Sequence, residues 1–120
     1  MSIVYLSPTS RRTMDLLPGT LDLLVLRILD DGPLHGYAIA RRIESLSEDV
    51  LSVEQGSLYP GLYRLERAGL IKAGRGTSET GRSVKTYALT AAGRRRLGEE
   101  VLGWDRFVEA VGRVVRGYAP

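Results

Sequence analysis

The feature that most constrains the fold is a seam of apolar residues in the C-terminal quarter of the chain. Its six members are spaced alternately four and three residues apart: Leu97, Val101, Trp104, Val108, Val111 and Val115. This 3.5-residue spacing is the one with which two helices pack along each other. A chain of 120 residues builds only a thin core. We therefore predict a long terminal helix that a second copy covers in a homodimer; packing against its own domain is the alternative.

The sequence contains few residues of the types that catalyse reactions or bind metals. It contains no cysteine and a single histidine, His35, which excludes disulfides and cysteine-based metal sites. No acid/base pair stands out, so we predict no catalytic residue, no metal, no cofactor and no enzyme activity. No apolar run approaches the roughly 18 residues of a membrane span, and residues 1–12 lack a signal-peptide pattern. We expect a cytoplasmic protein without a membrane partner.

Two helices are predicted in the first half of the chain. The first covers about 18–31, because Pro18 suits a helix start and apolar residues then recur on one helical face. The second opens near His35 and runs to about Ser45. Residues 1–14 show no periodicity and are expected to form a mobile arm, although translation from Met14 is an alternative. The inward face of the second helix is expected to consist of Tyr37, Ala40, Ile43 and Leu46.

A third helix is predicted to end before Gly69, but its start is open. Ser52 and Gln55 match a capping box, whereas Pro60 favours a start nearer Ser57. The buried side is expected to carry Leu58, Leu62 and Leu65.

Two short strands are predicted to follow the third helix and to form a β-hairpin. They cover 70–73 and 84–89 and flank a polar connection that is rich in glycine. Thr90 is the expected N-cap of the terminal helix. The predicted fold is thus mainly α with a small β-hairpin: a winged helix-turn-helix domain at 15–90, between the arm and a dimerisation helix at 91–118.

Basic side chains are concentrated in the middle of the chain. Residues 54–96 carry nine basic and three acidic side chains, whereas both flanking segments are slightly acidic. Such a segment is typical of a surface that binds a polyanion, although exposed arginines can also serve solubility alone. Hydroxyl and guanidinium groups suit base edges and phosphates. On this basis we predict DNA contacts from Ser57, Pro60, Tyr63, Arg64 and Arg67 with Tyr59 at their flank, from Lys72, Arg75, Arg82 and Lys85, and from His35 and Tyr37.

Three segments resemble the PadR family of transcriptional regulators: PGTLDLLVL at 18–26, GPLHGYAI at 32–39 and QGSLYPGL at 55–62. Matches at 64–71 and 87–93 extend the resemblance over about residues 16–110. The resemblance implies a homodimeric winged-helix repressor that binds a dyad-symmetric operator in double-stranded DNA. It also implies that Gln55, Ser57, Tyr59 and Pro60 lie at the DNA surface.

The resemblance bears on Trp104 as well. In drug-sensing relatives a tryptophan at the matching place lines a pocket between subunits, where flat aromatic ligands stack. An aromatic small-molecule effector that releases the repressor is therefore implied, whereas the place of Trp104 on the seam favours packing within the dimer. A winged-helix module that binds proteins without specific DNA binding is the alternative function.

Overall fold

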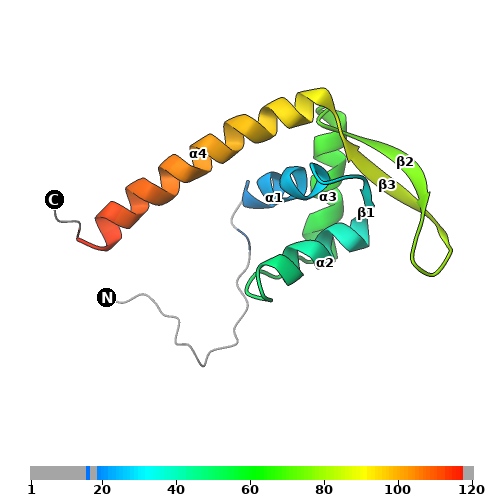
Figure 1. The fold of residues 1–120 in the computed structure, drawn as a ribbon, viewed down its shortest axis with the longest axis horizontal. Helices are drawn as coiled ribbons and strands as arrows, with labels where there is room; N and C mark the ends of the chain where they lie inside the picture. The colour runs from blue at the N-terminus through cyan, green and yellow to red at the C-terminus, as the bar shows by residue number, and fades with distance from the viewer. Residues whose placement is uncertain (1–15, 17–18, 118–120) are drawn as a thin grey trace.

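In the part of the chain that the structure describes, three helices build the body of the domain and a fourth extends away from it, while a β-hairpin projects from one side (Figure 1). The computed structural model describes residue 16 and residues 19–117. The arm at 1–14, Pro18 and Tyr118 therefore lie outside the described residues. Along the chain the elements are α1 (Thr20–Leu29), β1 (Leu34–His35), α2 (Gly36–Leu46), α3 (Gln55–Arg67), β2 (Ile71–Thr77), β3 (Ser83–Leu89) and α4 (Ala91–Val115).

Helix α1 is the central element of the core. It packs against α2, α3, α4 and β3, and six of its ten residues are buried. Among the described residues, no polar or charged side chain is buried. Fully burying a leucine or isoleucine contributes about 1.5–3 kcal/mol, so these side chains hold the three helices together. The largest fully buried side chains are Val25, Leu26, Leu29, Ile39, Leu58, Leu62 and Ile71.

Helix α2 presents a different face to the core from the one predicted. Ala40 and Ile43 are buried as expected, but Tyr37 is 57% exposed and Leu46 is 66% exposed. The prediction was wrong for these two residues. Ile39, which is 0% exposed, takes the inward place instead. The reason is geometric. The buried face of α2 carries Ile39, Ala40 and Ile43, which are three to four residues apart, and this rotation of the helix leaves Tyr37 and Leu46 facing solvent.

Helix α3 begins at Gln55, and the capping box predicted for its start does not form. Glu54 is the N-cap and its side chain caps no backbone N–H. The preceding segment is instead held by Glu44 of α2, whose Oε2 accepts a hydrogen bond from the backbone N–H of Val53 at 3.1 Å. Because α3 begins at Gln55, Pro60 lies inside the helix rather than in its first turn.

The hairpin of β2 and β3, with its connecting loop, forms the wing. Its strands pair antiparallel from Ile71↔Leu89 to Thr77↔Ser83, so the predicted hairpin is confirmed and its first strand is longer than expected. The two-residue strand β1 pairs with β3 and makes a three-stranded sheet in the order β1-β3-β2. No sequence pattern predicted β1, because a strand this short forms only where β3 supplies its partner.

Helix α4 begins where it was predicted to begin. The backbone N–H of Gly93 donates a hydrogen bond to Thr90 Oγ1 at 3.0 Å, which confirms Thr90 as the N-cap. The Thr90 hydroxyl in turn donates to the carbonyl of Gly69 at 2.7 Å and fixes α4 to the turn after α3. Gly117, with φ of +58°, lies beyond the last helical residue, Val115. None of the helices in residues 16 and 19–117 is long and apolar enough to span a membrane.

Candidate nucleic-acid interface

Helix α3 is amphipathic and carries an exposed ridge opposite its buried leucines. Leu58, Leu62 and Leu65 are buried as predicted. On the solvent side, residues spaced four, three and four apart form what we call the reading ridge: Gly56, Pro60, Tyr63 and Arg67. Arg67 Nη1 donates a hydrogen bond to the Tyr63 hydroxyl at 3.2 Å, and the guanidinium carbon lies 5.6 Å from the ring centroid. A phenol and a guanidinium are thus held together at the C-terminal end of this ridge.

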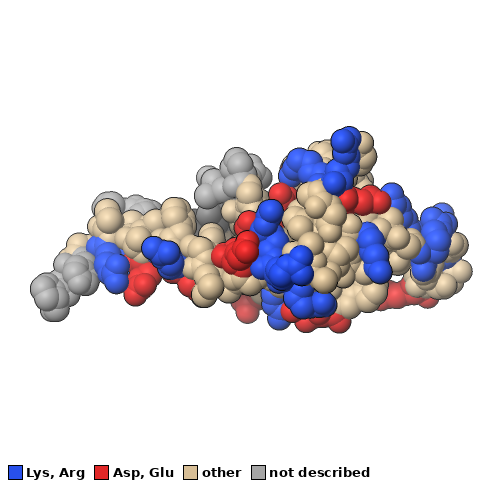
Figure 2. Space-filling model, turned by 90° about the horizontal axis from the view of Figure 1, so that it is seen from above, with Lys and Arg blue, Asp and Glu red and all other residues tan. Residues whose placement is uncertain are grey.

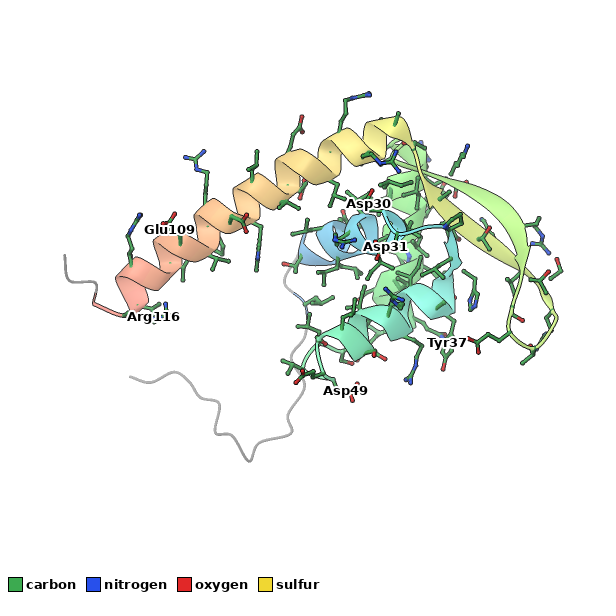
Figure 3. The ribbon with its side chains drawn as sticks, viewed as in Figure 1. Asp30, Asp31, Tyr37, Asp49, Glu109 and Arg116 are labelled. Carbon is green, nitrogen blue, oxygen red and sulfur yellow. The ribbon has the colours of Figure 1, made fainter. Side chains whose placement is uncertain are left out.

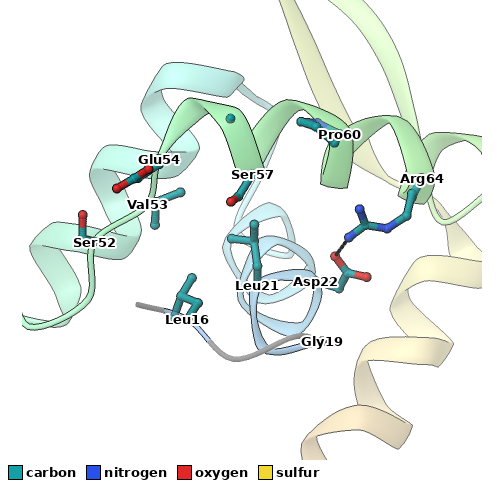
Figure 4. Close-up of a pocket in the computed structure, with 11 residues that line it drawn as sticks. Leu16, Gly19, Leu21, Asp22, Ser52, Val53, Glu54, Ser57, Pro60 and Arg64 are labelled. Atoms are coloured by element: carbon teal, nitrogen blue, oxygen red, sulfur yellow. Dashed lines mark hydrogen bonds and ion pairs between the residues drawn. The ribbon is translucent and has the colours of Figure 1, made fainter. Parts of the chain in front are cut away.

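Arg64 turns away from the reading ridge. Its Nη2 donates to Asp22 Oδ1 of α1 at 3.1 Å (Figure 4). Ser57, Pro60 and this ion pair line a hollow of about 540 Å³ between α1 and the first half of α3, the α1–α3 hollow. The helical pattern placed Arg64 on the same face as Tyr63, but it gave no sign of the contact with Asp22, because no local pattern joins positions 42 residues apart.

Tyr59 lies on the other side of the reading ridge from Arg64, and its side chain points towards the start of α2. Its ring lies so close to Gly36 that a Cβ on that glycine would come within 2.8 Å of the ring. A second hollow of about 620 Å³ opens between the start of α2 and the wing. This wing cleft collects side chains from three separate segments of the chain, all predicted to contact DNA: His35 and Tyr37, Tyr59, Arg82 and Lys85.

His35, which lines this cleft, also caps helix α2. Its Nδ1 accepts a hydrogen bond from the backbone N–H of Ala38 at 3.3 Å, so its ring caps α2. The ring is nearly parallel to that of Tyr37, at a centroid distance of 6.5 Å. This leaves Nε2 as the nitrogen of His35 that does not take part in the cap.

The wing is basic and exposed. Arg75 and Lys85 lie directly opposite each other in the ladder, so their side chains lie on one face of the wing. Like charges in such a pair destabilise a sheet unless an anion lies between them. Arg75 Nη2 donates to Ser83 Oγ at 3.0 Å, and Lys85 Nζ lies 5.5 Å from the ring centroid of Tyr87. Figure 2 shows lysine and arginine side chains gathered over the wing end of the molecule.

The seam on α4 is exposed along most of its length. Leu97 is only 6% exposed and belongs to the core of its own protomer. It is therefore not available to a second copy, unlike the other predicted members of the seam. The other five members are exposed, and side chains stand out from α4 well beyond the body of the domain (Figure 3). The exposed seam therefore consists of Val101, Trp104, Val108, Val111 and Val115.

Trp104 also lines a hollow within the single chain. This Trp104 hollow, of about 470 Å³, lies between the start of α1 and the middle of α4. Thr20 and Leu23 form one wall, and Phe107 lies 6.2 Å from Trp104 between ring centroids. Glu99 and Glu100 also line it. Trp104 thus lines this hollow and is also a member of the exposed seam.

Comparisons with known proteins agree with this architecture. The family model described as the transcriptional regulator PadR-like family matches residues 25–99. The chain is 35% identical over 93 residues to a transcriptional regulator of Mycobacterium tuberculosis, covering 78% of this chain and 79% of that protein. Its structure is similar to a transcriptional regulator from Clostridium thermocellum, with a TM-score of 0.72, 25% identity and coverage of 79% and 92%. It is also similar to a PadR-like transcriptional regulator of Bacillus cereus, with a TM-score of 0.70, 26% identity and coverage of 81% and 92%.

Proposed function

Because this chain belongs to the PadR-like family of transcriptional regulators, we propose that it is a homodimeric repressor that binds a dyad-symmetric operator in the cytoplasm. The family consists of regulators rather than enzymes, as expected for this sequence. The observation that carries the proposal is the reading ridge, where Arg67 and Tyr63 are exposed and already in contact. A guanidinium held in place loses less conformational freedom when it binds a base edge or a phosphate.

In this proposal α3 is the recognition helix and the wing contacts the flanking backbone. Two copies of α3, related by the dimer axis, enter successive major grooves about 34 Å apart. Arg75 and Lys85, which face the same side of the wing, contact phosphates and so relieve their mutual repulsion. The proposed DNA-contacting residues are Gln55, Ser57, Tyr59, Pro60, Tyr63, Arg64 and Arg67 of α3, Arg75, Arg82 and Lys85 of the wing, and His35 and Tyr37 at the start of α2.

The dimer is proposed to form through the exposed seam of α4. Its members repeat at the spacing of helix pairs, and a second copy of α4 offers the same spacing in return. Residues 91–118 would then be the dimerisation helix and residues 15–90 the DNA-binding domain. This is the arrangement that a two-fold symmetric operator requires.

An aromatic small molecule is proposed to release the repressor by binding in the Trp104 hollow. The indole of Trp104 and the ring of Phe107 supply apolar faces, and the carboxylates of Glu99 and Glu100 favour a ligand that carries positive charge. Release follows if the ligand binds more tightly to a dimer whose recognition helices are wrongly spaced.

The combined replacement Tyr63→Ala and Arg67→Ala tests the proposed recognition helix. We expect it to abolish sequence-specific binding, because each lost base contact costs about 1–3 kcal/mol. The mass of the dimer is expected to remain unchanged. Gel retardation measures the binding, with a duplex selected by the wild-type protein from a pool of random sequences.

Arg106→Ala is the control, because it removes an arginine from the side of α4 opposite the seam and should bind like the wild type. Specific binding that survives in the double variant would contradict the assignment of α3. If the wild type forms no complex that is specific to one duplex and weakens steeply as salt increases, the protein-binding module is favoured instead.

A further inference from the structure

The contact between Asp22 and Arg64 joins the first turn of α1 to the recognition helix. Asp22 Oδ1 and Arg64 Nη2 are 3.1 Å apart, and the side chains are 32% and 60% exposed. Among the ion pairs of residues 16 and 19–117, it is the only one that involves α3. Within the described residues, this pair is therefore the single ion pair that joins α3 to the rest of the domain.

The pair rests directly on the backbone of α3 at Gly61. A Cβ built on this buried glycine would lie 3.6 Å from Arg64 Nη2, 3.7 Å from Asp22 Oδ1 and 3.7 Å from Leu21 Cδ2. The guanidinium and the carboxylate thus lie at ordinary van der Waals distance from the place where a side chain would begin. The hydrogen bond to Asp22 restrains the guanidinium in this orientation.

The ion pair leaves most of the guanidinium available for a second partner. A guanidinium has five N–H donors, and Asp22 accepts a hydrogen bond from one nitrogen through one oxygen. Arg64 lines the α1–α3 hollow together with Ser57 and Pro60 of the recognition helix (Figure 4). Arg64 is thus oriented by α1 and at the same time open to DNA beside α3.

We propose that Asp22 is a positioning residue that sets the sequence specificity of DNA binding through Arg64. The inference rests on the proposed function. The carboxylate offsets the charge of Arg64, and this weakens its attraction to the phosphates of any duplex. It also holds the guanidinium in one orientation, which a bidentate contact with a base edge requires, whereas the attraction to phosphates also acts through charge alone. Asp22 therefore lowers non-specific binding and raises discrimination between sequences.

The test replaces Asp22 by alanine and measures binding to a pool of 30-base-pair duplexes of random sequence. We expect the variant to bind the unselected pool several-fold more tightly than the wild type. The slope of log affinity against log salt is expected to steepen by about one, the effect of one additional phosphate contact. Preference for the duplexes that the wild type selects from this pool is expected to fall about tenfold, the discrimination that one base contact provides.

Four further variants separate positioning from charge and from folding. Asp31→Ala removes the same charge from the turn after α1, where Asp31 pairs with Arg27 at 3.1 Å and with Arg42 at 3.6 Å, and we expect wild-type preference for the selected duplexes. Asp22→Glu restores a carboxylate and is expected to restore the preference. Asp22→Asn repeats the test with a side chain of the same shape if the alanine variant does not fold. In an Arg64→Ala background, Asp22→Ala should have no further effect, because the two residues act through one contact.

The outcomes separate this inference from the proposed function. If Asp22→Ala and Asp31→Ala change the salt slope and the sequence preference equally, the positioning role of Asp22 is overturned while specific DNA binding stands. The role is also overturned if Asp22→Ala weakens binding to selected and unselected duplexes by the same factor. If the wild type selects no sequence from the pool, the proposed function fails and the inference fails with it.

Discussion

Gly93→Ala is expected to lower the free energy of unfolding by about 3 kcal/mol, at the upper end of the cost of overpacking a core. Gly93 lies in the first turn of α4, directly against the turn that joins α3 to β2. An added methyl group would overlap the carbonyl oxygen of Leu70 and lie 2.8 Å from Leu89 Cδ1. Because the first obstacle is backbone, it cannot be relieved by rotation of a side chain. Urea unfolding followed by circular dichroism measures the loss.

Gly98→Ala is the matched control for this prediction. It places the same methyl group in the same helix, where nothing lies within 4 Å of the added carbon. Alanine is the better helix former by about 1 kcal/mol, so this variant is expected to be slightly more stable than the wild type. Equal stability of the two variants would contradict the close approach of α4 to the α3–β2 turn.

Val108→Glu is expected to convert the protein from a dimer to a monomer. Val108 is at the centre of the exposed seam, and a carboxylate there would have to be buried without a partner in the proposed interface. Sedimentation at micromolar concentration should give a mass of 13.2 kDa for the variant and twice that value for the wild type. Operator binding should fall with the dimer, because a monomer contacts a single half-site.

Ala110→Glu provides the control for the seam. It adds the same carboxylate to the same helix, two residues further along and on the side away from the seam. We expect this variant to remain a dimer. A dimeric Val108→Glu protein would show that the seam is not the interface, and α4 would then have to pack in another way.

The sequence predicted most of the helical framework, because apolar periodicity and capping residues are local signals. Thr90 was recognised as an N-cap from its place before the terminal helix, and the structure confirms the hydrogen bond. The start of α3 was less predictable, because a contact from Glu44 holds the preceding segment and no capping box forms. The packing role of Gly93 depends on its contact with the turn after α3, and no pattern in the neighbouring sequence predicts that contact.

The candidate interface was predictable in its composition but not in its detailed geometry. The leucine face of α3 fixed which side is exposed, so Tyr63 was placed correctly. The turn of Arg64 towards Asp22 depends on how α1 crosses α3, which no spacing within either helix encodes. The exposure of Tyr37 was missed for a similar reason, because the inward face of α2 is set by its neighbours.

Selection from a pool of random duplexes by the wild-type protein tests directly whether this protein binds a specific DNA sequence. We expect the selected sequences to share an inverted repeat whose half-sites lie about 10 base pairs apart, centre to centre. We also expect that two chains bind each selected duplex and that affinity falls steeply with salt. Recovery of sequences without a common motif, at several salt concentrations, would contradict the claim that this protein reads DNA through α3.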